Sequence, residues 1–274
     1  MRSDIWTPDN IVGQEIIDQY AQGKSARQLG FDHSVADVTI SAFLKRNNTK
    51  IRNRSEQKRK WTLNEKAFDK LSPEAFYWIG FLLADGNVHK TKTRSWQLCV
   101  GLAAKDSDHI EKFKKFIGCN KPLYFNEKNG GAFLIVYSNY LCERLAQFGM
   151  VPNKSKIVKI PEVCKNNRDF WRGMVDGDGW LTFNNSYPTL GLCGTLDVIN
   201  NFLVFVNRQE KIRAVSGIYQ VNFGCTTAQT IARILYENDT VSLTRKEKTC
   251  CEFLRWKPRF VQKRSLVYNS VDSI

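Results

Sequence analysis

The chain has 274 residues, 42% of them hydrophobic and 12% aromatic, which is typical of an ordered globular protein with one large domain or two to three small ones. Its 41 lysines and arginines against 27 acidic residues give a net charge of +14, which favours a polyanionic partner. The longest apolar run, from Phe76 to Ala84, is about half of what spans a bilayer, so a membrane partner is not expected.

The cysteines and histidines argue against a zinc site. None of the eight cysteines forms a C-x-x-C pair, and His33, His89 and His109 are far apart in the sequence. We interpret the cysteines as free thiols in a reducing cytosol. The first residues lack an apolar signal region, so a cytoplasmic protein is expected. Metal chemistry would have to rest on carboxylates.

Residues 1–46 are predicted to form three short helices. Ser25 is placed to cap the second helix, and the third runs over residues 35–45 with Val35, Val38, Ile40 or Phe43, and Leu44 facing inward. This pattern fits a helix-turn-helix, whose last helix enters the major groove of DNA. A helical bundle that contacts the rest of the protein is the alternative.

The segment 47–60 is predicted to be a basic linker. From Lys45 to Lys60 there are eight basic residues and a single acidic one, Glu56. Such a run is usually solvated, but here it adjoins a candidate DNA-binding unit. The candidate phosphate contacts in this region are Lys45, Arg46, Arg52 and Arg54.

Residues 61–264 read as an internal duplication. A repeat at 61–160 and a second at 161–264 each predict helix, hairpin, helix, hairpin, helix, followed by a tail at 265–274. The last hairpin is expected to have its strands at 214–219 and 220–225. The fold class is therefore α+β, a pseudo-symmetric pair of αββαββα repeats preceded by the helical unit.

The first helix of each repeat ends in a matching motif. The segment W-I-G-F-L-L-A-D-G at 78–86 aligns with W-R-G-M-V-D-G-D-G at 171–179. Small residues recur four apart, Gly80 with Ala84 and Gly173 with Gly177, so two helix backbones could approach closely. The glycines that follow, Gly86 and Gly179, are expected to end the helices with permissive backbone angles.

Asp85 and Asp178 therefore stand at helix C-termini, where the partial negative charge opposes a carboxylate. Packing the helices side by side would also bring the two carboxylates together. A divalent metal resolves both conflicts, and Mg²⁺ prefers oxygen ligands. The pattern predicts metal-assisted phosphodiester hydrolysis. A structural dimerisation helix with incidental aspartates is the alternative.

At these residues the chain resembles the LAGLIDADG homing endonucleases, in the single-chain form with two motifs. The resemblance covers about residues 61–264. It implies a monomer with a saddle of two antiparallel sheets that binds a long double-stranded DNA target and cuts both strands. It implies Mg²⁺, or Mn²⁺, held by Asp85 and Asp178 with help from the carbonyls of Ala84 and Gly177. Leu83 replaces the earlier acidic position of the motif, whereas Asp176 retains it.

Polar strand residues are the candidate DNA contacts. Lys90, Lys92 and Arg94 alternate with period two, so all three are expected on one face of the first hairpin. The remaining candidates are Gln97, Asn184, Gln220 and Asn222 on strands, and Lys154, Lys156 and Lys246 in segments that follow the repeats. These three lysines resemble active-site lysines of the family or contact phosphates.

Two other functions remain open. The same fold assists intron RNA splicing as a maturase, so intron RNA is a possible partner. A branch of the fold with a helix-turn-helix has lost catalysis and regulates transcription. Retention of both aspartates argues against the regulator. A freestanding or intron-encoded enzyme is favoured over an intein, because no splicing half is present.

Overall fold

A computed structural model describes residues 11–52, 61–92, 95–238 and 240–258. The chain divides into two compact units between Thr62 and Leu63. Each unit is described by itself. None of the helices in these ranges combines the length and apolar character needed to cross a membrane.

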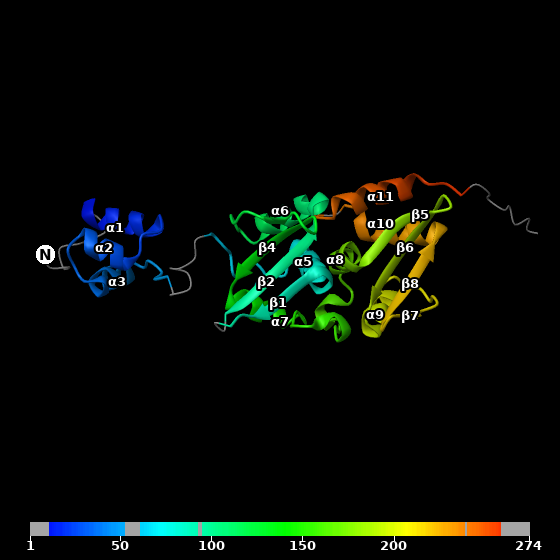
Figure 1. The fold of residues 1–274 in the computed structure, drawn as a ribbon, viewed down its shortest axis with the longest axis horizontal. Helices are drawn as coiled ribbons and strands as arrows, with labels where there is room; N and C mark the ends of the chain where they lie inside the picture. Colours follow the sequence, from blue (N-terminus) through cyan, green and yellow to red (C-terminus); the bar gives the residue numbers. More distant parts are fainter. Residues whose placement is uncertain (1–10, 53–60, 93–94, 239, 259–274) are drawn as a thin grey trace, which may run out of the picture. The chain divides into compact units, whose positions relative to one another are not determined.

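The first unit contains the three predicted helices, α1 (Ile11–Ala21), α2 (Ala26–Asp32) and α3 (Asp37–Arg46) (Figure 1). Ser25 begins α2 with a capping box. Its hydroxyl accepts from the Gln28 amide at 3.2 Å, and its own amide donates to the Gln28 side chain at 2.9 Å. The backbone turn before α3 passes so close to Gly30 that a Cβ there would lie 2.7 Å from the Val35 carbonyl oxygen.

A small apolar core holds these helices together, with Ile16, Leu29, Ile40, Phe43 and Leu44 fully buried. The prediction that Val38 faces inward is wrong, since 70% of it is exposed. Asp37 begins α3, so the inward face follows Ile40, Phe43 and Leu44, and the helical period places residue 38 on the opposite side.

The unit extends beyond residue 46. The Arg52 guanidinium donates to the carbonyls of Gly23 and Lys24 and lies 4.2 Å from the centre of the Tyr20 ring. Its amide donates to the Tyr20 hydroxyl at 2.8 Å. Residues 47–52 of the predicted linker are therefore packed on the helices.

The second unit begins with the first repeat. Its elements are α5 (Pro73–Asp85), β1 (Gly86–Lys90), β2 (Trp96–Ala103), the 3₁₀ turn η2 (Ala104–Asp106), α6 (Ser107–Phe116), β3 (Tyr124–Asn126), β4 (Gly131–Tyr137) and α7 (Asn139–Ala146). Ser72 caps α5 by accepting from the Ala75 amide, and Pro73 occupies its first position.

The second repeat follows two 3₁₀ turns, η3 (Lys154–Lys156) and η4 (Glu162–Cys164). Its elements are α8 (Arg168–Asp178), β5 (Gly179–Asn184), β6 (Tyr187–Gly194), α9 (Leu196–Phe205), β7 (Arg213–Val215), β8 (Ile218–Gly224) and α10 (Cys225–Tyr236), with α11 (Thr244–Arg255) beyond it. The predicted αββαββα order of both repeats is confirmed.

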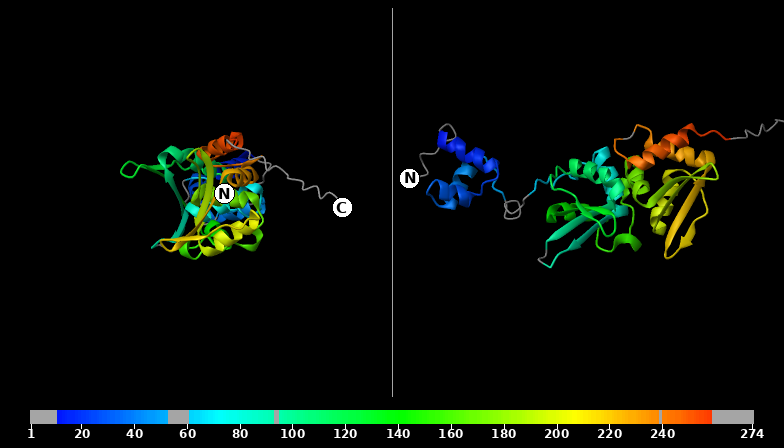
Figure 2. Two further views of the ribbon diagram at one scale, coloured as in Figure 1. Left: turned by 90° about the vertical axis from the view of Figure 1, so that its right-hand side faces the viewer. Right: turned by 45° about the horizontal axis from the view of Figure 1, so that its top comes forward.

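Each repeat forms one four-stranded antiparallel sheet, with strand orders β1-β2-β4-β3 and β5-β6-β8-β7. The helices cover one side of each sheet (Figure 2). Alternate strand residues such as Leu98, Val100, Leu190 and Leu192 are buried beneath them in a core that both repeats share. In the part of the second unit that the structure describes, no helix covers the opposite side of either sheet, which is called the open side.

Two details of the second repeat differ from the sequence prediction. The last hairpin turns at Ser216 and Gly217, both with positive φ, and not at 219–220. This two-residue turn suits a tight hairpin, and it makes β7 shorter and β8 longer than expected. Residues 244–255, for which no further helix was predicted, form α11, whose inward face carries Lys246, Cys250 and Phe253.

Candidate active site

The two motif helices, α5 and α8, cross with their backbones in contact. A Cβ on Gly80 would lie 2.1 Å from the Phe170 carbonyl oxygen, and one on Gly173 would lie 2.1 Å from the Tyr77 carbonyl oxygen. Near the helix ends, a Cβ on Gly177 would lie 2.3 Å from the Cβ of Ala84. The small residues therefore set the separation of the helices over their whole shared length.

The glycines that end the motif helices have ordinary backbone angles. Gly86 has φ of −75° and Gly179 has φ of −98°, so the predicted permissive angles are wrong. Close packing excludes a side chain instead. A Cβ on Gly86 would lie 2.7 Å from the Leu82 carbonyl oxygen, and one on Gly179 would lie 2.6 Å from the Val175 carbonyl oxygen.

Asp85 and Asp178 lie close together at the adjoining ends of α5 and α8. The Asp85 carboxylate is 3.4 Å from the position of a Cβ on Gly177, the residue before Asp178. Burial raises the pKa of Asp85. Burial and then the neighbouring Asp85 carboxylate raise the pKa of Asp178 to about 6. The arrangement concentrates negative charge in a site that disfavours it.

Two lysines oppose this charge, one at each helix end. Lys154 donates to the Ala84 carbonyl at 3.2 Å. Lys246 is 2% exposed and donates to the carbonyls of Val175, Asp176 and Gly179 at 2.6 to 2.7 Å. Burial lowers the pKa of Lys154 and lowers that of Lys246 to about 8, and the aspartates counteract both shifts. The predicted Lys156, at the end of η3, is exposed.

The oxygen atoms at the adjoining ends of α5 and α8 suit a hard divalent cation more than a soft one. They comprise two carboxylates whose raised pKa values a cation would reverse, with the carbonyls of Ala84 and Gly177 close by. In the described part of the chain, no three His, Cys, Asp or Glu side chains cluster as a metal site. Two carboxylates with carbonyl and water oxygens make up the kind of incomplete protein ligand set that Mg²⁺ accepts.

Each lysine is held in place by the opposite repeat. Beyond Lys154, the Ile160 amide donates to Asp197 at 2.7 Å and the Val158 carbonyl accepts from Thr195 at 2.7 Å, both at the start of α9. These two contacts form a latch on the second repeat.

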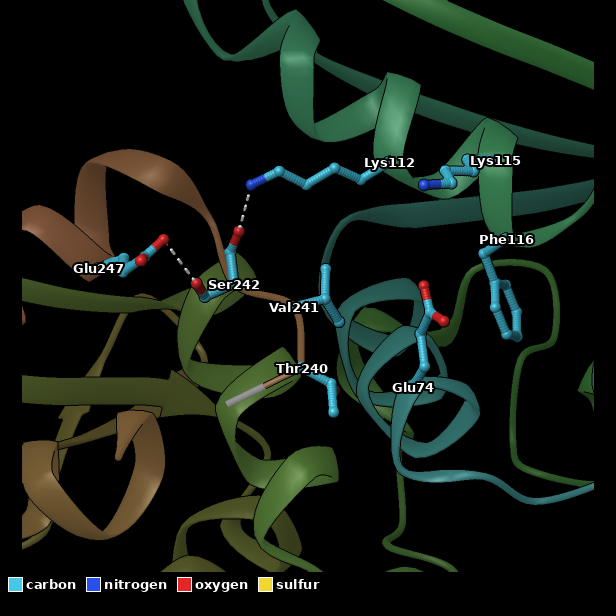
Figure 3. A pocket seen from close by; sticks show the side chains of 8 residues that line it. All are labelled: Glu74, Lys112, Lys115, Phe116, Thr240, Val241, Ser242 and Glu247. Carbon is cyan, nitrogen blue, oxygen red and sulfur yellow. Dashed lines mark hydrogen bonds between the residues drawn. The ribbon is translucent and has the colours of Figure 1, made fainter. Parts of the chain in front are cut away.

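The matching latch on the first repeat joins α6 to the segment that carries Lys246. Lys112 donates to the Ser242 carbonyl at 2.9 Å, Thr244 donates to Asp108 at 2.6 Å and Arg245 pairs with Asp106 at 3.0 Å. Figure 3 shows Lys112 reaching Ser242 across a surface pocket that is also lined by Glu74, Lys115 and Glu247. Neither Asp85 nor Asp178 is among the residues that line this pocket.

A buried polar network lies behind the carboxylates. Asp176 accepts from the Tyr77 hydroxyl at 2.7 Å, the Tyr236 hydroxyl at 2.6 Å and the Leu243 amide at 2.7 Å. The Tyr77 hydroxyl is also 2.8 Å from Nε2 of His109, whose pKa burial lowers to about 3. Asp176 is thus buried, and its carboxylate is bound by donors from within the protein.

No protein-family model matches the chain, and no curated protein matches it. Solved structures do resemble it. The LAGLIDADG meganuclease I-AabMI, crystallised with uncleaved DNA, aligns with a TM-score of 0.50 and 12% identity over 68% of this chain and 90% of that chain. I-CpaMI, also bound to uncleaved DNA, aligns with a TM-score of 0.50 and 10% identity over the same shares.

The chain has the LAGLIDADG fold. The resemblance expected from the two motifs is confirmed at this level. The predicted strand contacts are placed differently in the two repeats.

In the second repeat, the predicted strand residues face the open side. Register places Leu190 and Leu192 against the helices, and therefore Asn184, Gln220 and Asn222 on the opposite side. Asn184 and Asn222 are exposed and Gln220 is half-buried.

In the first repeat the prediction was partly wrong. β1 ends at Lys90, which pairs with Trp96 and so shares the helix-covered side with Val88; its ammonium lies 5.6 Å from the centre of the Trp96 ring. Lys92 is in the turn beyond the strand, so period-two alternation does not reach it. Gln97 faces the open side, but only 9% of it is exposed on a central strand.

The remaining basic candidates within the described residues belong to the first unit. Lys45 and Arg46 are exposed at the end of α3 in the first unit, whereas Arg52 is tied to that unit's own carbonyls. Arg54 and Arg94 lie outside the described residues.

Sequence reasoning missed the latches and the network around Asp176. It named Lys154 and Lys246 without assigning them equivalent places. A signal for that equivalence was present, since Lys154 follows Asp85 by 69 residues and Lys246 follows Asp178 by 68. The latch residues carried no such signal, because their partners lie in the other repeat.

Proposed function

We propose that this protein is a LAGLIDADG homing endonuclease that cuts double-stranded DNA at a specific site. The observation that carries the proposal is the meeting of Asp85 and Asp178 at the ends of two helices packed through Gly80 and Gly173. The open faces of the two sheets carry side chains that suit contacts with DNA bases. The net charge of +14 also favours DNA as the partner. Both carboxylates come from one chain, so a monomer suffices.

Asp85 and Asp178 would hold Mg²⁺ or Mn²⁺, assisted by the carbonyls of Ala84 and Gly177. When bound, a divalent cation supplies Lewis acidity that activates water and stabilises charge on the leaving oxygen. The residues of the chain provide the rest. Lys154 and Lys246 hold positive charge beside the carboxylates, and the scissile phosphates would lie above the helix ends where this charge balances theirs.

The first unit would extend recognition along the DNA. Its three helices with their own core fit a helix-turn-helix, and α3 carries Asp37 at its start and Lys45 and Arg46 at its exposed end. The cationic end would contact backbone phosphates, which add affinity without sequence information.

The test is a cleavage selection from a randomised duplex library with Mg²⁺. We expect one enriched cut site. Asp85→Asn and Asp178→Asn should each abolish cutting and leave binding within a fewfold, because each change removes a carboxylate and keeps the shape of the side chain. Binding is measured on the selected duplex.

Folded protein that enriches no cut site would contradict the proposal. Enriched binding without cutting would support a regulator instead. Splicing of an intron RNA that survives Asp85→Asn, with no cut DNA, would support a maturase. Glu127→Gln, on an exposed turn, is the control that should change neither cutting nor binding.

A further inference from the structure

The open faces of the two sheets differ at matching positions. Gly86 pairs with Val100 in the first sheet, and Gly179 pairs with Leu192 in the second, so Val100 and Leu192 correspond. The next residues, Gly101 and Cys193, face Phe133 and Gln220. Phe133 therefore occupies in the first repeat the place that Gln220 occupies in the second.

The same register extends the comparison. Ile135 faces Cys99 as Asn222 faces Gly191, and Tyr124 faces Phe133 as Arg213 faces Gln220. At three matching positions the second repeat thus presents Arg, Gln and Asn, whereas the first presents Tyr, Phe and Ile. All six lie on the side away from the helices.

The apolar set of the first repeat is laid out on the surface. Tyr124 is 60% exposed and its ring centre is 6.3 Å from that of Phe133. The Phe133 ring lies across β2, where a Cβ on Gly101 would be 2.6 Å from it. Tyr137, next along β4, is 50% exposed. These four residues, Tyr124, Phe133, Ile135 and Tyr137, are the apolar face.

Positive charge borders the apolar face and does not interrupt it. Lys121 donates to the Ile135 carbonyl at 2.7 Å, and its ammonium lies 5.9 Å from the centre of the Tyr137 ring. An apolar surface edged by a cation matches a DNA groove, where base edges lie between phosphates. The apolar face belongs to the same sheet as β1, the strand that follows Asp85.

We propose that the two repeats read their half-sites by different chemistry: the apolar face recognises thymine 5-methyl groups, and Arg213, Gln220 and Asn222 read purines by hydrogen bonds. The methyl of thymine is the apolar group on the major-groove edge, whereas amides pair with adenine and arginine with guanine. The inference rests on the proposed endonuclease function.

The test uses the duplex obtained by selection with the full chain. Asn222→Ala should relax base preference in one half only, which assigns that half to the second repeat. Uracil is then substituted for thymine in each half separately, since uracil pairs identically but lacks the methyl group. Dissociation constants are measured by fluorescence anisotropy at fixed salt.

We expect uracil to weaken binding about fourfold for each contacted methyl in the half of the first repeat, the equivalent of one buried carbon. Uracil in the other half should change it less than twofold. The double variant Phe133→Gln with Ile135→Asn should remove the uracil effect and change the selected bases in that half alone. Its melting temperature checks that it folds.

Equal uracil effects in both halves, no effect in the first, or a first half without selected thymine would overturn the inference while cutting continues. Failure to select any duplex would instead remove the proposed function on which it rests. Light scattering tests whether the apolar face instead binds a second copy of the chain. A dimer that Phe133→Gln dissociates, with no change in DNA affinity, would overturn the inference in favour of that occupant.

Discussion

At the scale of single residues, the carboxylates at the helix ends carry an energetic cost. The pKa of Asp178 is raised from an ordinary value near 3.8 to about 6, so between these values the folded state binds more protons than the unfolded state. Without divalent ions, stability contributed by this group is full below about pH 4 and is lost as pH rises through about 6. The ionised Asp178 carboxylate therefore lowers the stability of the folded protein above about pH 6.

Asp178→Asn should therefore stabilise the protein at pH 7 in EDTA by at most about 3 kcal/mol, the equivalent of the pKa shift, and have little effect at pH 4. Adding Mg²⁺ should raise the melting temperature of the parent protein and leave that of Asp178→Asn nearly unchanged. Thermal unfolding at the two pH values measures both effects. A variant that is destabilised equally at pH 4 and pH 7 would show that the carboxylate is not under strain.

At the scale of elements, the crossing of α5 and α8 depends on the absence of side chains at two positions. Gly173→Ala would push its Cβ to 2.1 Å from the Tyr77 carbonyl oxygen, which belongs to a helix backbone that cannot yield locally. We expect a loss of about 3 kcal/mol or more in the free energy of unfolding, at the upper end for overpacking. Denaturant unfolding measures it.

The matched control is Gly224→Ala. Gly224 has an ordinary φ of −118°, and nothing lies within 4 Å of a Cβ built on it. Because Gly224 is the N-cap of α10, where alanine is less favourable than glycine, this variant should lose at most about 1 kcal/mol. If Gly173→Ala were tolerated as well, the helices would not be in backbone contact.

The latches predict a second effect at the element scale. Asp197→Ala removes the acceptor of the Ile160 amide and should loosen the segment that carries Lys154. We expect cleavage to slow about ten- to a hundredfold, since small displacements of a positioned group are costly, with little change in DNA affinity. Single-turnover rates and binding constants separate the two.

A double-variant cycle tests whether the latch acts through the lysine. In the background of Lys154→Met, Asp197→Ala should have little further effect on the cleavage rate. Additive losses would mean that Asp197 acts in some other way. Glu162→Ala, which removes only an exposed ion pair with Lys165 on the same segment, serves as the control.

At the scale of the whole molecule, the first unit has its own core and is divided from the repeats at Thr62 and Leu63. A fragment of residues 63–274 should therefore still cut the selected site, because both aspartates and both lysines remain. Its footprint on DNA should be shorter and its affinity lower. Nuclease footprinting and binding assays measure these.

Substitution of Lys45 and Arg46 by Gln in the full chain should reproduce part of the loss of DNA affinity expected for the fragment. It should also reduce the salt dependence of DNA binding. A fragment with an unchanged footprint and affinity would show that the first unit does not touch DNA. It would then be the helical bundle that the sequence left as an alternative.

Much of this architecture was readable from the sequence because the relevant signals are local. The period of apolar residues, the caps Ser25 and Ser72, Pro73 and the repeated small residues depend on neighbours a few positions away. The duplication then carried each prediction from one repeat to the other, including the pairing of Asp85 with Asp178.

Only the tertiary structure decided which polar groups those elements bring together. Asp176 belongs to the same motif as Asp178, yet it is buried against Tyr77 and Tyr236, which lie in distant parts of the chain. Lys246 reached the site on a helix the sequence reading missed, held by the opposite repeat. Lys92 lost its expected face because β1 ends at Lys90, where its pairing with β2 ends. Such contacts are set by packing between segments, and no local pattern of residues encodes them.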